Sequence, residues 1–162
     1  MVEFNLVKYS EIPELAKLAS SIWHEYWTVI LSPEQIDYMV ENFQSEKAIK
    51  HQYDNEKYQY YFINCDGENI GYFGISDKED YLFLSKLYIS KEFRHRGIGA
   101  LAFEKIKQIA KDGNFNSIRL TVNKYNKNTI AAYNKYGFNT IDSVVTDIGS
   151  GFVMDDYIME YQ

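Results

Sequence analysis

The stretch that decides the fold runs from Leu82 to Gly113 and reads LFLSKLYISKEFRHRGIGALAFEKIKQIAKDG. Its first part, Leu82–Ile89, is mostly hydrophobic and predicts a strand. From Ile98 onward, apolar residues recur at helical spacing, which predicts a helix with one buried face. Asp112 and Gly113 end that helix, because glycine readily adopts the left-handed conformation of a C-terminal cap.

The loop between this strand and this helix combines basic residues with glycines, in the order Arg94-His95-Arg96-Gly97-Ile98-Gly99. The first backbone N–H groups of a helix have no partner within the helix, and the helix dipole adds partial positive charge there. Gly97 and Gly99 carry no Cβ atom, so a phosphate can approach the backbone closely. Arg94 and Arg96 add charged, planar donors that suit phosphate. The sequence therefore predicts a diphosphate site and a cofactor to occupy it.

Two classes of cofactor fit a glycine turn of this kind. The segment GIGALA at 97–102 matches the dinucleotide pattern G-x-G-x-x-A. A dinucleotide fold also needs an acidic residue at the end of the next strand. That strand is predicted at 117–122 (SIRLTV), and it contains no carboxylate. A dinucleotide-binding oxidoreductase therefore stays an alternative, and the basic residues before the glycines favour a different diphosphate.

The spacing R-x-x-G-x-G, formed by Arg94, Gly97 and Gly99, resembles the pyrophosphate loop of the GNAT acetyltransferase superfamily, which binds acetyl-coenzyme A. Residues 126–138 (NKNTIAAYNKYGF) look like the second motif of that family, N-x-x-A-x-x-x-Y-x-x-x-G-F, with Thr129 in place of the usual alanine. The resemblance covers nearly the whole chain. It implies one GNAT domain over 1–162, an α/β fold whose mixed, mostly antiparallel sheet of about seven strands is flanked by about four helices.

The same resemblance implies roles for individual residues. The backbone of the central strand would pair with the pantetheine arm, and one N–H near Leu87 or Ile89 would polarise the thioester carbonyl. Tyr133 would donate a proton to the departing thiolate, since a phenol of pKa about 10 can assist a leaving group of pKa about 8.5. The residues expected to bind the cofactor are Leu87, Tyr88, Ile89, Arg94, His95, Arg96, Gly97, Ile98, Gly99 and Asn126.

Periodicity and turn signals place the other elements in the order β-α-α-β-β-β-α-β-α-β-β. Ser10 is expected to cap the first helix, and Ser32-Pro33 with Gln35 forms a capping box that begins the second. Asp66-Gly67 predicts a hairpin turn. The predicted strands are 3–8, 58–64, 69–76, 82–89, 117–122, 140–146 and 152–160, and residues 45–53 add a turn or two of helix.

Composition limits the classes of function. The chain has 162 residues, 46% hydrophobic, which predicts one globular domain. Its net charge of −6 disfavours nucleic acid and mildly favours cationic partners. A single cysteine, Cys65, fits a reducing compartment, and neither a signal peptide nor a membrane span is apparent, so we predict a cytoplasmic protein. No His, Cys or Asp cluster has metal-ligand spacing.

The segments IWHEYW, SPEQIDYMVENFQS and GFVMDDYIME look similar to bacterial polyamine acetyltransferases of the spermidine/spermine type. We therefore expect transfer of the acetyl group of acetyl-coenzyme A to a primary amine, a small amine or polyamine, by direct attack in a ternary complex. A protein or peptide α-amine acceptor and a non-catalytic acyl-CoA sensor are alternatives, and a homodimer is one assembly that the resemblance allows.

The general base is the open point of this mechanism. Relatives are described with a carboxylate on the central strand, whereas this strand offers Ser85 and Lys86 and no acid. His24, Glu25 and a water molecule held by Ser85 are the candidates that the sequence suggests.

Overall fold

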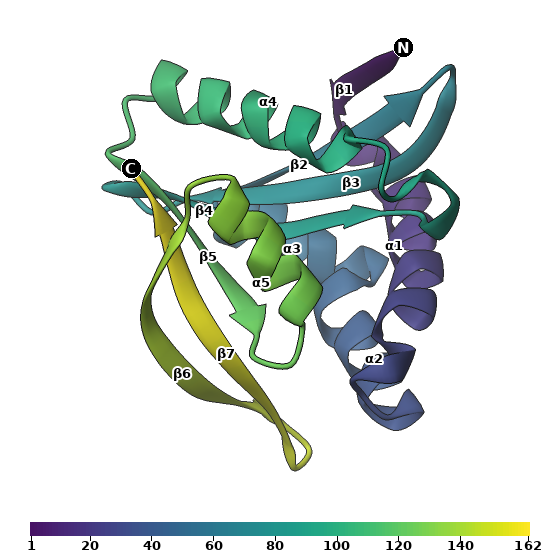
Figure 1. Ribbon diagram of the computed structural model, residues 1–162. Helices are drawn as coiled ribbons and strands as arrows, with labels where there is room; N and C mark the ends of the chain where they lie inside the picture. The colour runs from purple at the N-terminus through teal and green to yellow at the C-terminus, as the bar shows by residue number, and fades with distance from the viewer.

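Seven strands form one sheet in the order β1-β2-β3-β4-β5-β7-β6 in the computed structural model, which describes all residues from 1 to 162 (Figure 1). Only β4 and β5 run parallel, and every other neighbouring pair is antiparallel. The expected mixed, mostly antiparallel sheet is therefore confirmed. The strands are β1 (Val2–Leu6), β2 (Tyr58–Cys65), β3 (Glu68–Asp77), β4 (Tyr81–Ile89), β5 (Ser117–Asn123), β6 (Asn139–Gly149) and β7 (Phe152–Tyr161).

Helices cover both faces of the sheet, with α4 and α5 on one side and α1, α2 and α3 on the other (Figure 1). The structure has five α-helices where about four were expected, because the Ser45 hydroxyl caps a separate helix by accepting from the Ala48 N–H. No helix combines the length and apolar character that a bilayer crossing requires. The helices are α1 (Ile12–Tyr26), α2 (Pro33–Met39), α3 (Glu46–Asn55), α4 (Ile98–Asp112) and α5 (Lys127–Lys135).

Two predicted helix starts had different outcomes. The Ser32 side chain accepts a hydrogen bond from the Gln35 N–H at 3.2 Å, so the predicted cap of α2 is confirmed. Ser10 makes no capping bond and lies in a short 3-10 turn before α1. The Glu11 carboxylate closes that turn instead, because it accepts from the Lys8 N–H at 2.9 Å.

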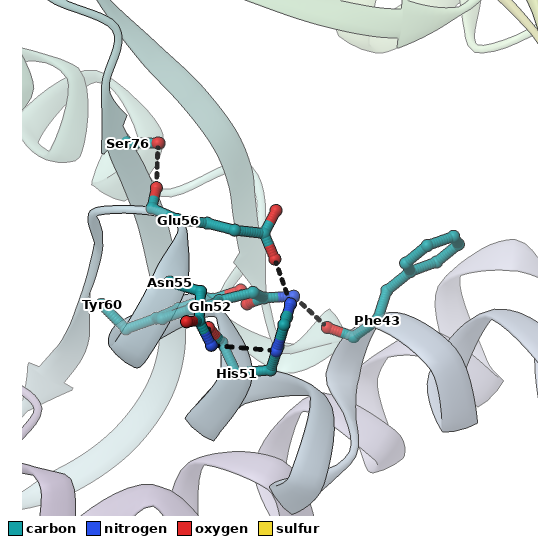
Figure 2. A network of polar contacts seen from close by, with 7 residues as sticks. All are labelled: Phe43, His51, Gln52, Asn55, Glu56, Tyr60 and Ser76. Atoms are coloured by element: carbon teal, nitrogen blue, oxygen red, sulfur yellow. Dashed lines mark hydrogen bonds and ion pairs between the residues drawn. The ribbon is translucent and has the colours of Figure 1, made fainter.

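A buried chain of hydrogen bonds ties the helices of one face to the sheet. It starts at Trp23 on α1 and ends at the Phe43 carbonyl, in the π-helical turn Val40–Gln44 between α2 and α3. Figure 2 shows its last step, in which Gln52 of α3 donates to that carbonyl at 2.9 Å. The members between are the buried side chains of Tyr72, Gln44, Tyr60 and Gln52.

A β-bulge changes which side chains of β4 face which helix layer. Gly74 of β3 pairs with Lys86 and Ile75 pairs with Leu84, so Ser85 is an extra residue on β4. Before the bulge, Leu84 packs in the core cluster beneath α4. After it, Tyr88 packs against the α1 side, and Lys86 shares that face because side chains alternate along a strand.

The ion pair between His24 of α1 and Asp37 of α2 should make stability depend weakly on pH. The two side chains meet at 2.7 Å, and the hydrogen bond to Asp37, followed by that to the Ser20 carbonyl, raises the pKa of His24. A raised pKa adds stability below about pH 6.5 and loses it as the pH rises through the folded-state value. Because both groups are exposed, the difference is ~0.5 kcal/mol or less.

Urea unfolding of the wild type and of Asp37→Asn at pH 5.5 and pH 8.5 measures this contribution. We expect the variant to be less stable than the wild type at the lower pH and nearly equal to it at the higher pH. A deficit of the same size at both pH values would contradict the assignment to His24.

Candidate active site

One cavity of about 1400 Å³ lies where β4 and β5 separate, and it reaches from the start of α4 to the helix layer of α1 and α3. The β4–β5 ladder pairs Tyr81–Leu84 with Ser117–Leu120 and then stops. Beyond it, residues 85–89 of β4 and 121–123 of β5 line the cavity. The fold therefore opens between two parallel strands at the point where the cofactor was expected. We call this cavity the cleft.

The turn before α4 has the backbone form of an anion site. His95 and Gly97 have positive φ angles of 62° and 79°, with negative φ between them at Arg96. Such alternation points successive N–H groups into one concavity. The N–H groups of residues 95–100 donate no backbone hydrogen bond, no side chain caps α4, and its first turn has no acidic residue. This turn fits a diphosphate.

The two arginines of this turn lie differently. Arg94 lines the cleft, and its guanidinium is engaged by the protein: Nε donates to the Ile89 carbonyl at 2.8 Å and Nη2 pairs with Glu25 at 2.6 Å. Arg96 lies over the Phe93 ring at 5.3 Å and does not line the cleft. Arg94 therefore fastens α1 to the end of β4, and phosphate binding by either side chain stays a prediction.

The edge of β4 that faces β5 leaves peptide groups free. The Ser90 N–H donates to the Ile70 carbonyl of β3 at 2.7 Å. Because the backbone groups of a strand alternate between its two edges, Tyr88 also faces β3, and Leu87 and Ile89 face the cleft. The Ile89 carbonyl is taken by Arg94, which leaves the Leu87 and Ile89 N–H groups as candidate oxyanion donors.

Tyr133 is placed by α5 at the wall of the cleft, and its hydroxyl has no hydrogen-bond partner. It is 8% exposed, and burial raises the pKa of its phenol, so the group holds its proton at neutral pH. A protonated, unpartnered hydroxyl beside the splayed strands is available as a general acid.

Asn126, at the start of α5, donates to the Tyr26 hydroxyl at 2.5 Å and also lines the cleft. The same Tyr26 oxygen meets Thr129 at 2.8 Å. Thr129 is the residue that departs from the family pattern, and its hydroxyl gives α5 a contact with α1 that alanine could not make. The side-chain amide of Asn126 is thus partly engaged within the protein.

Of the expected site residues, the structure brings all but Arg96 to the walls of this cleft. Two of the suggested bases do not reach it: His24 bonds Asp37 on the outer surface, and Glu25 pairs with Arg94. Ser85 lines the cleft, where its hydroxyl accepts from Tyr58 at 2.9 Å. No three His, Cys, Asp or Glu side chains gather closely enough to hold a metal ion.

Two ionisable groups in the cleft were missed as a pair by sequence reasoning. Lys86 of β4 donates to Ser85 at 2.7 Å, and burial lowers its pKa to about 8. Asp156 of β7 is buried, and desolvation raises its pKa to about 6. The strand predicted at 152–160 is confirmed, but no sequence signal showed which of Asp155 and Asp156 faces the cleft.

Comparison with known proteins agrees with this geometry. The family model described as "Acetyltransferase (GNAT) family" matches residues 15–138. The chain therefore belongs to the GNAT acetyltransferase family, a class of acetyl-coenzyme A-dependent N-acetyltransferases. A Drosophila melanogaster protein named as a probable N-acetyltransferase, san, is 38% identical over 69 residues, which span 42% of this chain and 38% of that protein. An uncharacterized N-acetyltransferase of Lactobacillus delbrueckii is 23% identical over 92% of both chains.

Solved structures share the fold. The PaiA N-acetyltransferase of Thermoplasma acidophilum, in complex with coenzyme A, superposes with a TM-score of 0.83 at 22% identity, covering 100% of this chain and 99% of that one. The ribosomal-protein-S18-alanine N-acetyltransferase of Escherichia coli gives a TM-score of 0.72 at 17% identity, covering 99% and 92%. At these identities the likeness shows the fold and leaves the acceptor open.

Proposed function

We propose that this protein acetylates a small primary amine, with polyamines as the leading candidates, in a reducing, cytoplasmic compartment. One observation carries the proposal: a single cleft holds the free N–H groups of the turn before α4, the free edge of β4 and the protonated Tyr133. These are the parts that binding a diphosphate, polarising a thioester and protonating a thiolate require.

In the proposed reaction, the turn at residues 94–99 holds the pyrophosphate of acetyl-coenzyme A and β4 aligns its thioester. The neutral amine nitrogen attacks the thioester carbonyl carbon, so a C–N bond forms as the C–S bond breaks. The Leu87 or Ile89 N–H stabilises the oxyanion. Tyr133 gives its proton to the departing sulfur, and a base takes the proton that the amine loses.

The far end of the cleft supports a cationic acceptor. Carboxylates of Glu41, Glu56 and Asp156 line it, together with the aromatic rings of Trp27 and Tyr58. Carboxylates and aromatic faces both attract ammonium groups. A polyamine presents one amine for reaction and further cations for these carboxylates, which fits the acidic chain as a whole.

Thiol release from acetyl-coenzyme A, measured over a panel of polyamines, amino acids, aminoglycosides and a peptide with a free α-amine, tests the acceptor class. We expect turnover with at least one polyamine. Turnover confined to the peptide would replace the proposal with the α-amine alternative, and binding without turnover would favour an acyl-CoA sensor. Calorimetry with NAD(P) excludes or supports a dinucleotide site.

Tyr133→Phe should lower kcat by about 30-fold while leaving coenzyme A affinity unchanged, because it removes the proton donor and keeps the ring. Steady-state kinetics and calorimetry measure the two quantities. Tyr61→Phe is the matched control, since Tyr61 lies on β2 outside the cleft. An unchanged kcat in Tyr133→Phe would remove this hydroxyl from the mechanism.

A further inference from the structure

We propose that Asp156 is the general base that takes the proton from the acceptor ammonium, an inference that rests on the proposed function. In this step the N–H bond of the ammonium breaks, its proton moves to the Asp156 carboxylate, and the freed electron pair attacks the thioester carbonyl. The protonated carboxyl then returns its proton to solvent through the open cleft. The nitrogen loses a second proton as the amide forms, and this proton restores Tyr133, which has given its own to the departing sulfur, so the cycle needs no further reactant.

The sheet fixes the position of Asp156. It pairs with Asn123, the last residue of β5, beside the gap between β4 and β5. On the same strand, the side chains of Tyr157 and Met159 pack toward the α4 side of the sheet. Because side chains alternate along a strand, Asp156 lies on the opposite face. Lys86 lies on that same face. The carboxylate therefore lies on the α1 side of the cleft, where we place the acceptor amine.

Asp156 is the buried carboxylate among the residues that line the cleft. It is 8% exposed, its side chain makes no hydrogen bond, and its Oδ1 atom is both inaccessible to solvent and unpartnered. Buried carboxylates normally have a hydrogen-bond donor. A carboxylate without a partner on the wall of a substrate cleft is explained if the acceptor ammonium donates to its other oxygen, Oδ2, which is accessible.

The charges around Asp156 come from three elements. Asp155 precedes it on β7, Lys86 and the Tyr88 phenol face it from β4, and Lys124 follows β5. Lys124 is itself paired with Asp155 at 2.8 Å. Burial, then Asp155, raises the pKa of Asp156, and the two lysines oppose that rise, which leaves it at about 6. The carboxylate is thus mostly ionised at neutral pH and more basic than an ordinary aspartate.

Lys86 shows what the cleft does to an amine. Burial lowers its pKa to about 8, although Asp156 and Glu56 act in the opposite direction. An acceptor amine in the same surroundings loses its proton more readily than in water, where its pKa is about 10.4. Transfer from an ammonium of pKa near 8 to Asp156 is about 100-fold unfavourable, against more than 10,000-fold for an ammonium with the solution value.

Three other ionisable groups of the cleft suit this role less well. Glu56 is exposed, and its carboxylate turns toward His51 of α3 at 3.7 Å (Figure 2). Lys86 is mostly protonated at pH 7 and donates to Ser85. Tyr133 holds its proton and lies on the α5 side, where it serves the leaving sulfur.

The pH dependence of Asp156→Asn tests the proposal, because the substitution keeps the shape and removes the base. In the wild type, kcat/KM for the amine found by the acceptor panel should rise through an apparent pKa near 6. In Asp156→Asn that limb should disappear and kcat should fall about 50-fold at pH 7. The rate should recover as the pH approaches the pKa of the free amine. Coenzyme A affinity, measured by calorimetry, should not change.

Asp155→Asn is the matched control, since it removes a carboxylate one residue away on the opposite face. We expect it to keep kcat at pH 7 within about twofold and to move the limb to lower pH, because Asp155 raises the pKa of Asp156. If Asp156→Asn does not fold, Asp156→Ala with added formate replaces it, and formate should restore part of the lost rate. If the wild type is active and its Asp156 variants keep both kcat and the acidic limb of the pH profile, this inference alone is overturned. If the wild type acetylates no amine, the proposed function is overturned as well.

Discussion

Gly97→Asp is expected to weaken coenzyme A binding by about 200-fold. Gly97 precedes α4 with φ of 79°, and a Cβ atom placed there would meet nothing within 4 Å. The substitution therefore creates no clash in the free protein, and aspartate tolerates positive φ better than most residues. A carboxylate about 5 Å from a phosphate costs about 3 kcal/mol in a partly buried site, which corresponds to that loss of affinity.

Two further variants separate charge from backbone strain. Gly151→Asp is the matched control, because Gly151 has φ of 80° and an equally open Cβ position in the β6–β7 turn. It should lose as much thermal stability as Gly97→Asp and keep full affinity. Gly97→Asn has nearly the same shape without the charge, so it should bind more tightly than Gly97→Asp.

Calorimetry with coenzyme A gives the affinities, and thermal unfolding gives the stabilities. If Gly97→Asp binds coenzyme A as the wild type does, the pyrophosphate does not lie at this turn, and the assignment of residues 94–99 fails. Equal losses of affinity in Gly97→Asp and Gly151→Asp would instead attribute the effect to a general loss of structure.

The parts of this protein that could be predicted from the sequence are those that local chemistry determines. The strand β4, its glycine turn and the start of α4 lie together along the chain, so spacing and conformational preference indicate them directly. The position of Tyr133 at the cleft could be predicted because it stands at a fixed distance from Asn126 and Gly137 in one motif. In both cases, few long-range contacts are needed to place the residues.

The side of the cleft that faces α1 depends on contacts that the sequence does not display. The bulge at Ser85 turns Lys86 to that side, and only the pairing with β3 reveals it. Asp156 reaches the cleft through the register of β7 on β5. Arg94 lines the cleft as expected, and its guanidinium pairs there with Glu25, a residue far away in the chain. Register and distant ion pairs are global properties, which explains why Lys86 and Asp156 could not be placed in the cleft from spacing.

Tyr72→Phe is expected to lower the free energy of unfolding by about 3 kcal/mol. Tyr72 is fully buried in β3, where its hydroxyl accepts from Trp23 Nε1 at 2.7 Å and donates to Gln44 Oε1 at 2.6 Å. Removing that oxygen leaves a buried donor and a buried acceptor without partners. Each such group costs about 1–3 kcal/mol.

The matched control is again Tyr61→Phe, because the Tyr61 hydroxyl makes no hydrogen bond and the side chain is only half-buried. Urea unfolding should place this control within about 0.5 kcal/mol of the wild type. If both variants lose the same stability, the loss reflects the ring environment and the hydrogen-bond chain contributes nothing specific.

A double-mutant cycle with Gln44→Leu tests whether these side chains act as one network. Gln44 is fully buried; its Oε1 accepts from the Tyr72 hydroxyl, and its Nε2 donates to Tyr60 at 3.2 Å. Because Leu has no acceptor, Gln44→Leu alone should leave the Tyr72 O–H without a partner. The double variant lacks both the Tyr72 O–H and the Gln44 Oε1 atom, so neither group is left without its partner. The double variant should therefore lose about 1–2 kcal/mol less than the sum of the single losses. Strict additivity would show that Tyr72 and Gln44 stabilise the helix layer over the cleft independently of each other.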